Sequence, residues 1–125
     1  MSTSPTHSTT PVADAARDIF RRARKYIERG WEKYAVARLS DGRICGPMAD
    51  DASVWSLSGA VDRALYETKD KGVLPKRVYL YDALSRVIHA REGGRALIIW
   101  DWHMAPERTK ADVLAVLDGA IESPT

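Results

Sequence analysis

The sequence has few cysteines, no long apolar run and little net charge, and each of these narrows the class of protein to which it can belong. A single cysteine, Cys45, excludes a disulfide within the chain and is typical of a protein from a reducing compartment. The longest uninterrupted apolar run covers residues 96–100, far short of the roughly 20 residues that a membrane-spanning helix needs. Lys and Arg number 19 and Asp and Glu 17, so the overall charge of +2 demands neither a nucleic-acid nor a membrane partner. We expect a cytoplasmic protein that does not bind membranes.

The composition predicts one domain preceded by a tail. Residues 1–10 are mostly Ser, Thr and Pro without an apolar stretch, which predicts a disordered tail rather than a secretory signal or a membrane anchor. The chain is 45% hydrophobic and 29% charged, as is usual for globular proteins. Residues 11–122 are therefore expected to form a single globular domain with one core.

Two helices have clear start signals. Thr10 is a predicted N-cap with Pro11 at the first helical position, and apolar residues then recur at helical spacing until Gly30, which we expect to end the helix as a left-handed cap. Near the C-terminus, Thr109 and Asp112 have the spacing of a capping box, with Asp in place of the usual Glu. These signals predict helices at the two ends of the domain.

Two further helices are predicted between them. The second begins near Asp50 or Asp51 and ends before Gly72, with Val54 and Trp55 facing inward and Gly59 in its middle. A glycine at that position indicates a close approach, either of another helix or of a Trp ring. The third begins at Pro75 and ends at Gly93. Its inward residues are expected to be Val78, Tyr81, Leu84, Val87 and Ile88.

Residues 34–45 alternate in polarity around the turn pair Asp41-Gly42, which predicts a short β-hairpin or an extended loop. Residues 96–99 are apolar and partly β-branched, and are either a strand that pairs with this hairpin or a buried extended segment. The expected fold is mainly α, with about four helices around one core and a hairpin or a short element of two or three strands. An α+β fold is the alternative.

The run 98–109 contains two of the four tryptophans and leads directly into the last helix. If this run is extended, Trp100 and Trp102 share one face and Asp101 points away from it. They either lock the core together or form a binding surface, because Trp, Tyr and Arg are enriched in binding hot spots. The candidate partner-binding residues are Trp100, Trp102, His103 and Arg108.

The first helix also carries a basic face. Arg17, Arg21, Arg24 and Lys25 lie on one side and are candidate phosphate-contacting residues. The alternative is a solvated face that Asp14, Asp18 and Glu28 partly neutralise. We favour this alternative, since most charged helix faces are of that kind.

No motif predicts a catalytic, cofactor or metal site. Cys45 lacks a base nearby in the sequence and is more simply a small buried residue. Ser56-Leu57-Ser58-Gly59 lies in a predicted helix rather than at a strand–turn–helix junction, so it is not a nucleophile elbow. A metal site would have to combine Cys45, His89, Asp101 and His103 from separate segments, and isolated histidines are more often packing or surface residues.

Three segments together resemble a family of small uncharacterised bacterial and phage proteins, a domain of unknown function. They are Gly30-Trp31 with Ala35-Val36-Ala37-Arg38 and Asp41-Gly42, the segment from Ala52 to Val61, and Trp102-His103-Met104-Ala105-Pro106-Glu107-Arg108-Thr109. In that family a Gly-Trp-Cys segment, a Trp-Cys…Gly-Ala helix and a Trp-Asn-Asp-x-Pro-x-Arg-Thr junction recur. The similarity spans roughly residues 12–122.

This chain departs from the family pattern at the chemically reactive positions. Glu32 and Ser56 stand where the family has cysteines, and His103-Met104 stands where it has Asn-Asp. The resemblance implies a shared fold and a setting in bacterial or mobile-element genomes, but no activity.

The leading hypothesis is therefore a non-enzymatic accessory protein that acts through protein–protein contacts, with a prophage or similar element as its expected source. The alternative is a nucleic-acid-associated regulator that uses the basic face of the first helix. An enzyme with an unrecognised site comes third. The sequence does not predict an oligomeric state.

Overall fold

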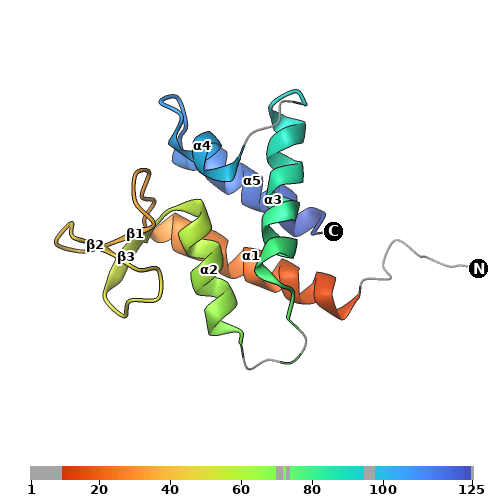
Figure 1. Cartoon of the computed structure of the whole chain (residues 1–125), viewed down its shortest axis with the longest axis horizontal. Helices are drawn as coiled ribbons and strands as arrows, with labels where there is room; N and C mark the ends of the chain where they lie inside the picture. Colours follow the sequence, from red (N-terminus) through yellow and green to blue (C-terminus); the bar gives the residue numbers. More distant parts are fainter. Residues whose placement is uncertain (1–9, 70–71, 73, 95–97, 125) are drawn as a thin grey trace, which may run out of the picture.

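The computed structural model describes residues 10–69, 72, 74–94 and 98–124. Five helices, α1 (Pro11–Arg29), α2 (Leu57–Glu67), α3 (Arg77–Arg91), α4 (Ile99–Met104) and α5 (Lys110–Glu122), surround one core (Figure 1). Three short strands, β1 (Ala37–Leu39), β2 (Ile44–Cys45) and β3 (Ala52–Trp55), form a sheet at the end of the molecule where α1 finishes. The expected mainly α fold with a small strand element is confirmed. The predicted disordered tail lies outside the described residues apart from Thr10.

Helix α1 is central because α2 and α5 both pack along it. Its start is as predicted: the Thr10 hydroxyl accepts a hydrogen bond of 3.0 Å from the Ala13 N–H, and Pro11 follows. Gly30 ends the helix as predicted, but the expected left-handed conformation is wrong, since this residue has φ −173°, which is extended. Gly30 is instead required by close packing, because a Cβ there would lie 2.6 Å from Val54 Cγ1 and 2.7 Å from the Ser53 carbonyl oxygen.

The sheet has the order β2-β1-β3, and both pairings are antiparallel. The predicted hairpin is confirmed: Gly42, with φ 91°, makes the turn between β1 and β2, and Ala37 pairs with Cys45. Cys45 is half-buried rather than fully buried.

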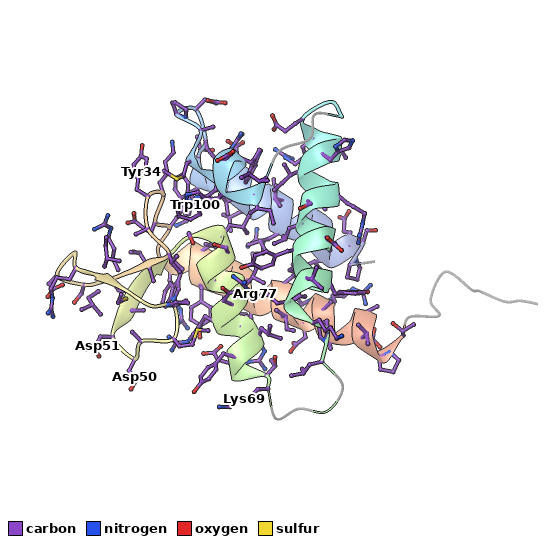
Figure 2. All side chains as sticks on the ribbon, in the orientation of Figure 1. Tyr34, Asp50, Asp51, Lys69, Arg77 and Trp100 are labelled. Atoms are coloured by element: carbon purple, nitrogen blue, oxygen red, sulfur yellow. The ribbon has the colours of Figure 1, made fainter. Side chains whose placement is uncertain are left out.

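The predicted start of the second helix is wrong. Residues 52–55 form strand β3, in which Val54 pairs with Arg38 of β1. Helix α2 begins only at Leu57, and the Ser56 hydroxyl is its cap, accepting a 3.0 Å hydrogen bond from the Gly59 N–H. Asp50 and Asp51 lie in the loop before β3, away from the start of α2 (Figure 2).

Gly59 therefore lies in the first turn of α2 and not in the middle of a helix. The predicted close approach is present, but its partner is neither a helix nor a Trp ring. A Cβ at Gly59 would lie 2.3 Å from the Val36 carbonyl oxygen, which accepts a hydrogen bond from the Ser56 N–H. The glycine thus allows the chain before β1 to pass directly over the start of α2.

Helix α3 starts at Arg77, two residues after the predicted Pro75. Val78 was expected to face inward, but it is 63% exposed, whereas Leu80 and Ala83 are fully buried in addition to the predicted Leu84 and Ile88. The predicted Tyr81 and Val87 are half-buried against the core.

Residues 99–104 of the tryptophan run form helix α4 rather than an extended segment. Ile99 begins α4, so the predicted strand at residues 96–99 is wrong at its last residue, and residues 96 and 97 lie outside the described part. Helix α5 then starts with the predicted capping box between Thr109 and Asp112. In the described part of the chain, no helix is long and apolar enough to cross a membrane.

Gly59→Ala tests the packing at the start of α2. The new Cβ would collide with a backbone oxygen, so we expect the free energy of unfolding to fall by about 2 kcal/mol or more. Gly46→Ala is the matched control because no described atom lies within 4 Å of its Cβ; it should change stability by less than about 0.5 kcal/mol. Chemical denaturation measures both, and an equal effect of the two substitutions would contradict the close approach.

Candidate functional site

Two of the four candidate partner-binding residues are part of the internal structure. Trp102 is 1% exposed, and its indole Nε1 donates a 3.2 Å hydrogen bond to the Glu92 carboxylate. The Arg108 guanidinium lies 4.1 Å from the centre of the Trp102 ring, and its Nε donates to the Trp102 carbonyl at 2.8 Å. Together they fix the connection from α4 to α5 and leave little surface for a partner.

His103 is also buried, and it joins three segments. Its Nε2 accepts a 2.8 Å hydrogen bond from the Trp31 indole and faces the Leu57 N–H at 3.4 Å. Its ring stacks against Trp100, with 5.8 Å between ring centres and 19° between ring planes. The imidazole therefore connects α4 to the start of α2 and to the segment that follows α1.

Burial lowers the pKa of His103 from 6.5 to about 4, and the positive charges of Lys33 and Arg108 act in the same direction. A backbone contact with Lys33 and the charge of Glu32 oppose this shift without cancelling it. The ring is neutral at pH 7, and because Nε2 accepts hydrogen bonds, the proton is assigned to Nδ1. Nδ1 has no hydrogen-bond partner among the described residues.

Trp100 is half-buried and lies outside the core cluster of the described residues. It borders a hollow of about 400 Å³ between α3, α4 and the start of α2. Ile98, which is 66% exposed, and Ile99 continue its apolar wall. The other lining residues are polar: Ser58, Arg77, Tyr81 and Ser85.

The charged groups beside this hollow neutralise each other. Arg77 lies between α2 and α3 (Figure 2). It donates two hydrogen bonds to the Asp62 carboxylate, at 2.8 and 3.0 Å. The Tyr81 hydroxyl accepts from Arg77 at 2.9 Å and donates to Asp62 at 2.8 Å. Burial raises the pKa of Tyr81, so its hydroxyl stays protonated. Arg77, Asp62 and Tyr81 thus form one hydrogen-bonded network without net charge.

Sequence reasoning identified Trp100 but did not assign Ile98, Ile99, Tyr81 and Arg77 to a site. The spacing of Arg77 and Tyr81 on one helix face was an available signal. Their convergence with Asp62 depends on the packing of α3 against α2 and has no local signature.

The predicted phosphate-contacting residues divide into two pairs. Arg17 donates to the Ile121 carbonyl at 2.9 Å, and Arg24 contacts Asp118 at 2.6 Å and Glu28 at 2.9 Å. These two arginines hold α1 to α5. Arg21 and Lys25 form no ion pair within the described part of the chain. The favoured interpretation, a neutralised face, therefore describes Arg17 and Arg24 but not Arg21 and Lys25.

Arg21 and Lys25 border a second hollow, of about 350 Å³, at the surface of α1. Arg22, Arg29 and Tyr26 also line it, together with the acidic residues Asp18 and Glu67.

The remaining candidate groups do not converge. Within the described residues no three His, Cys, Asp or Glu side chains lie close enough together to hold a metal ion. The combination of Cys45, His89, Asp101 and His103 is therefore not assembled: Cys45 lies in β2, His89 in α3, and Asp101 and His103 in α4.

Comparison with models of known protein families shows to which family the chain belongs. The model of a family of unknown function (DUF6197) matches residues 11–123, and the chain therefore belongs to this family. No curated protein and no solved structure matches the chain.

Substituting His103 by Gln tests the buried imidazole. The pKa of His103 is lower in the folded state than its ordinary value of 6.5, so acid protonates the unfolded chain first. The contribution of the neutral His103 to the free energy of unfolding is complete above pH 6.5 and is lost as the pH falls toward 4. Between pH 7 and pH 5, wild type should lose about 2 kcal/mol more of its free energy of unfolding than His103→Gln, which does not titrate.

Denaturation at a series of pH values measures this difference. The variant is the control for the carboxylates, which titrate in both proteins. Parallel pH profiles of the two proteins would show that His103 is not held neutral by burial.

Proposed function

We propose that this member of DUF6197 is a non-enzymatic accessory protein that binds another protein through the hollow beside Trp100. The observation that supports this is the apolar edge at its mouth, where Ile98 is 66% exposed next to the half-buried Trp100. An exposed apolar edge beside a cavity offers the contact that a partner's anchoring side chain buries on binding.

The chemistry of the hollow favours an uncharged anchor. Arg77 and Asp62 neutralise each other, so a charged partner group would lose its hydration without gaining a counter-charge. The apolar wall of Ile98, Ile99 and Trp100 suits an aliphatic or aromatic side chain, and the hydroxyls of Ser58 and Ser85 offer hydrogen bonds to a partner backbone.

The walls are held in place before any partner arrives. Trp100 stacks on the buried His103, and Tyr81 is fixed between Arg77 and Asp62. Because the site is preformed, binding a partner costs less conformational entropy. This favours a site for recognition over a catalytic site that needs loop closure. The polar groups of Arg77, Asp62 and Tyr81 already satisfy one another, which supports a role without catalysis.

A bacterial or prophage setting and a cytoplasmic location belong to this proposal. The first rests on the resemblance described above and the second on the single cysteine. The partner is then expected among the cytoplasmic proteins of the same host.

Ile98→Asp tests the proposed surface. Tagged wild type and variant are incubated with nuclease-treated host lysate, and the bound proteins are quantified by mass spectrometry. Burying an unpaired carboxylate against Trp100 should reduce recovery of the specific partner at least tenfold. Ile44→Asp is the matched control, because Ile44 is 69% exposed but lies on the hairpin in β2, and it should retain the partner.

Equal recovery by all three proteins, or equal loss with both variants, would contradict a site at Ile98. Sedimentation measures whether the chain associates with itself. If wild type does so and Ile98→Asp does not, the partner at this surface is a second copy of this chain rather than another protein.

A further inference from the structure

The basic residues of α1 differ in whether their charge is paired within the protein. Arg22 pairs with Asp18 at 3.0 Å, and Arg17 and Arg24 are engaged with α5 and with acidic residues of α1. In the described part of the chain, Arg21, Lys25 and Arg29 have no carboxylate within ion-pair distance. These three residues are called the cationic row below.

The cationic row lies along one side of α1. Its members are four residues apart, so they repeat at intervals of about 6 Å and span about 12 Å along the helix axis. All three line the same hollow of about 350 Å³. A row of evenly spaced cations on a straight helix suits a ligand with several negative charges along its length.

The acidic residues at this hollow do not neutralise the row. Asp18 is paired with Arg22. The Glu67 carboxylate accepts a hydrogen bond from the Tyr26 hydroxyl and pairs with Arg63 at 3.2 Å. The Arg29 guanidinium lies over the Tyr26 ring, 5.5 Å from its centre, which holds it at the hollow without removing its charge.

We propose that Arg21, Lys25 and Arg29 bind consecutive phosphates of a nucleic-acid strand independently of its base sequence. Each residue contributes a cation to one or two phosphate oxygens, and bound counter-ions are released from the strand. Tyr26 keeps its place at the hollow because its ring packs against Trp55, with 4.6 Å between ring centres. Its hydroxyl is occupied by Glu67, so it does not read bases.

Two other phosphate sources fit the geometry less well. A single free phosphate is usually enclosed by donors from several segments, whereas the three unpaired cations here all come from one helix. A lipid surface would favour apolar side chains beside the cations. None of the strongly exposed large apolar residues in the described chain lines this hollow.

The test is binding of the full chain to a fluorescent 20-nucleotide single strand, followed by anisotropy over a range of salt concentrations. Three phosphate contacts predict a slope of about −2 for the logarithm of the affinity against that of the salt concentration. The double variant Arg21→Ala with Lys25→Ala should weaken binding at low salt at least tenfold. It should also bring the slope to about −0.7, since one contact remains.

The control removes the same charge elsewhere. Arg43 and Arg86 are exposed on the hairpin and on α3, and the double variant Arg43→Ala with Arg86→Ala should keep the wild-type slope. Circular dichroism establishes whether both double variants remain folded. If the variant with Arg21→Ala and Lys25→Ala does not fold, Lys25→Ala alone replaces it, and we expect a slope between those of wild type and the double variant.

An equal loss in both double variants would show an effect of net charge only and would overturn the proposal. So would the absence of wild-type binding at about 20 mM salt. Two further arms use inorganic phosphate alone and vesicles containing phosphatidylserine. Binding to either of these that depends on Arg21 and Lys25, without binding to the strand, would reassign the row to a free phosphate or to a lipid surface.

Discussion

One neutral imidazole holds together three parts of this fold that are distant in the sequence. The Nε2 atom of His103 accepts the Trp31 N–H and faces the Leu57 N–H, so a proton at this nitrogen would oppose both. The surface depends on the same group, since Trp100 rests on the face of the ring. The apolar hollow is therefore coupled to the core through a residue that must stay uncharged.

The parts of the fold that the sequence predicts well are those with local causes. The start of α1 depends on Thr10 and Pro11, and the start of α5 on Thr109 and Asp112, all within one helical turn. The turn at Gly42 is local in the same sense. Each of these signals acts between neighbours in the chain, so no knowledge of the tertiary structure is needed to recognise it.

The parts that were predicted wrongly depend on contacts far along the chain. Residues 52–55 have apolar spacing that also suits a helix, and they become a strand because they pair with β1. Asp50 was as good a cap as Ser56 by residue type alone. At Gly30 a standard C-cap signal is present, yet the residue is extended, because Ser53 and Val54 pass too close for a side chain.

The candidate sites show the same limit. A helical projection places Arg21 and Arg24 on the same basic face, but only Arg24 meets Asp118, which lies 94 residues away. Likewise Trp100 and Trp102 are equivalent by residue type, whereas α4 buries one and leaves part of the other at the surface. Sequence patterns identify the segments that carry unusual side chains, and tertiary packing decides which of them remain available.

The residues that remain available have different chemistry in the two hollows. At Trp100 the charges of Arg77 and Asp62 cancel, so the binding proposed there depends on apolar burial, which added salt does not screen. Along α1 the charges of Arg21, Lys25 and Arg29 are not cancelled, so the phosphate binding proposed there must weaken as salt rises. Ionic strength therefore changes the affinity expected at α1 but not the affinity expected at Trp100. A partner whose affinity falls strongly with salt is expected to bind through α1, even if it also contacts Trp100.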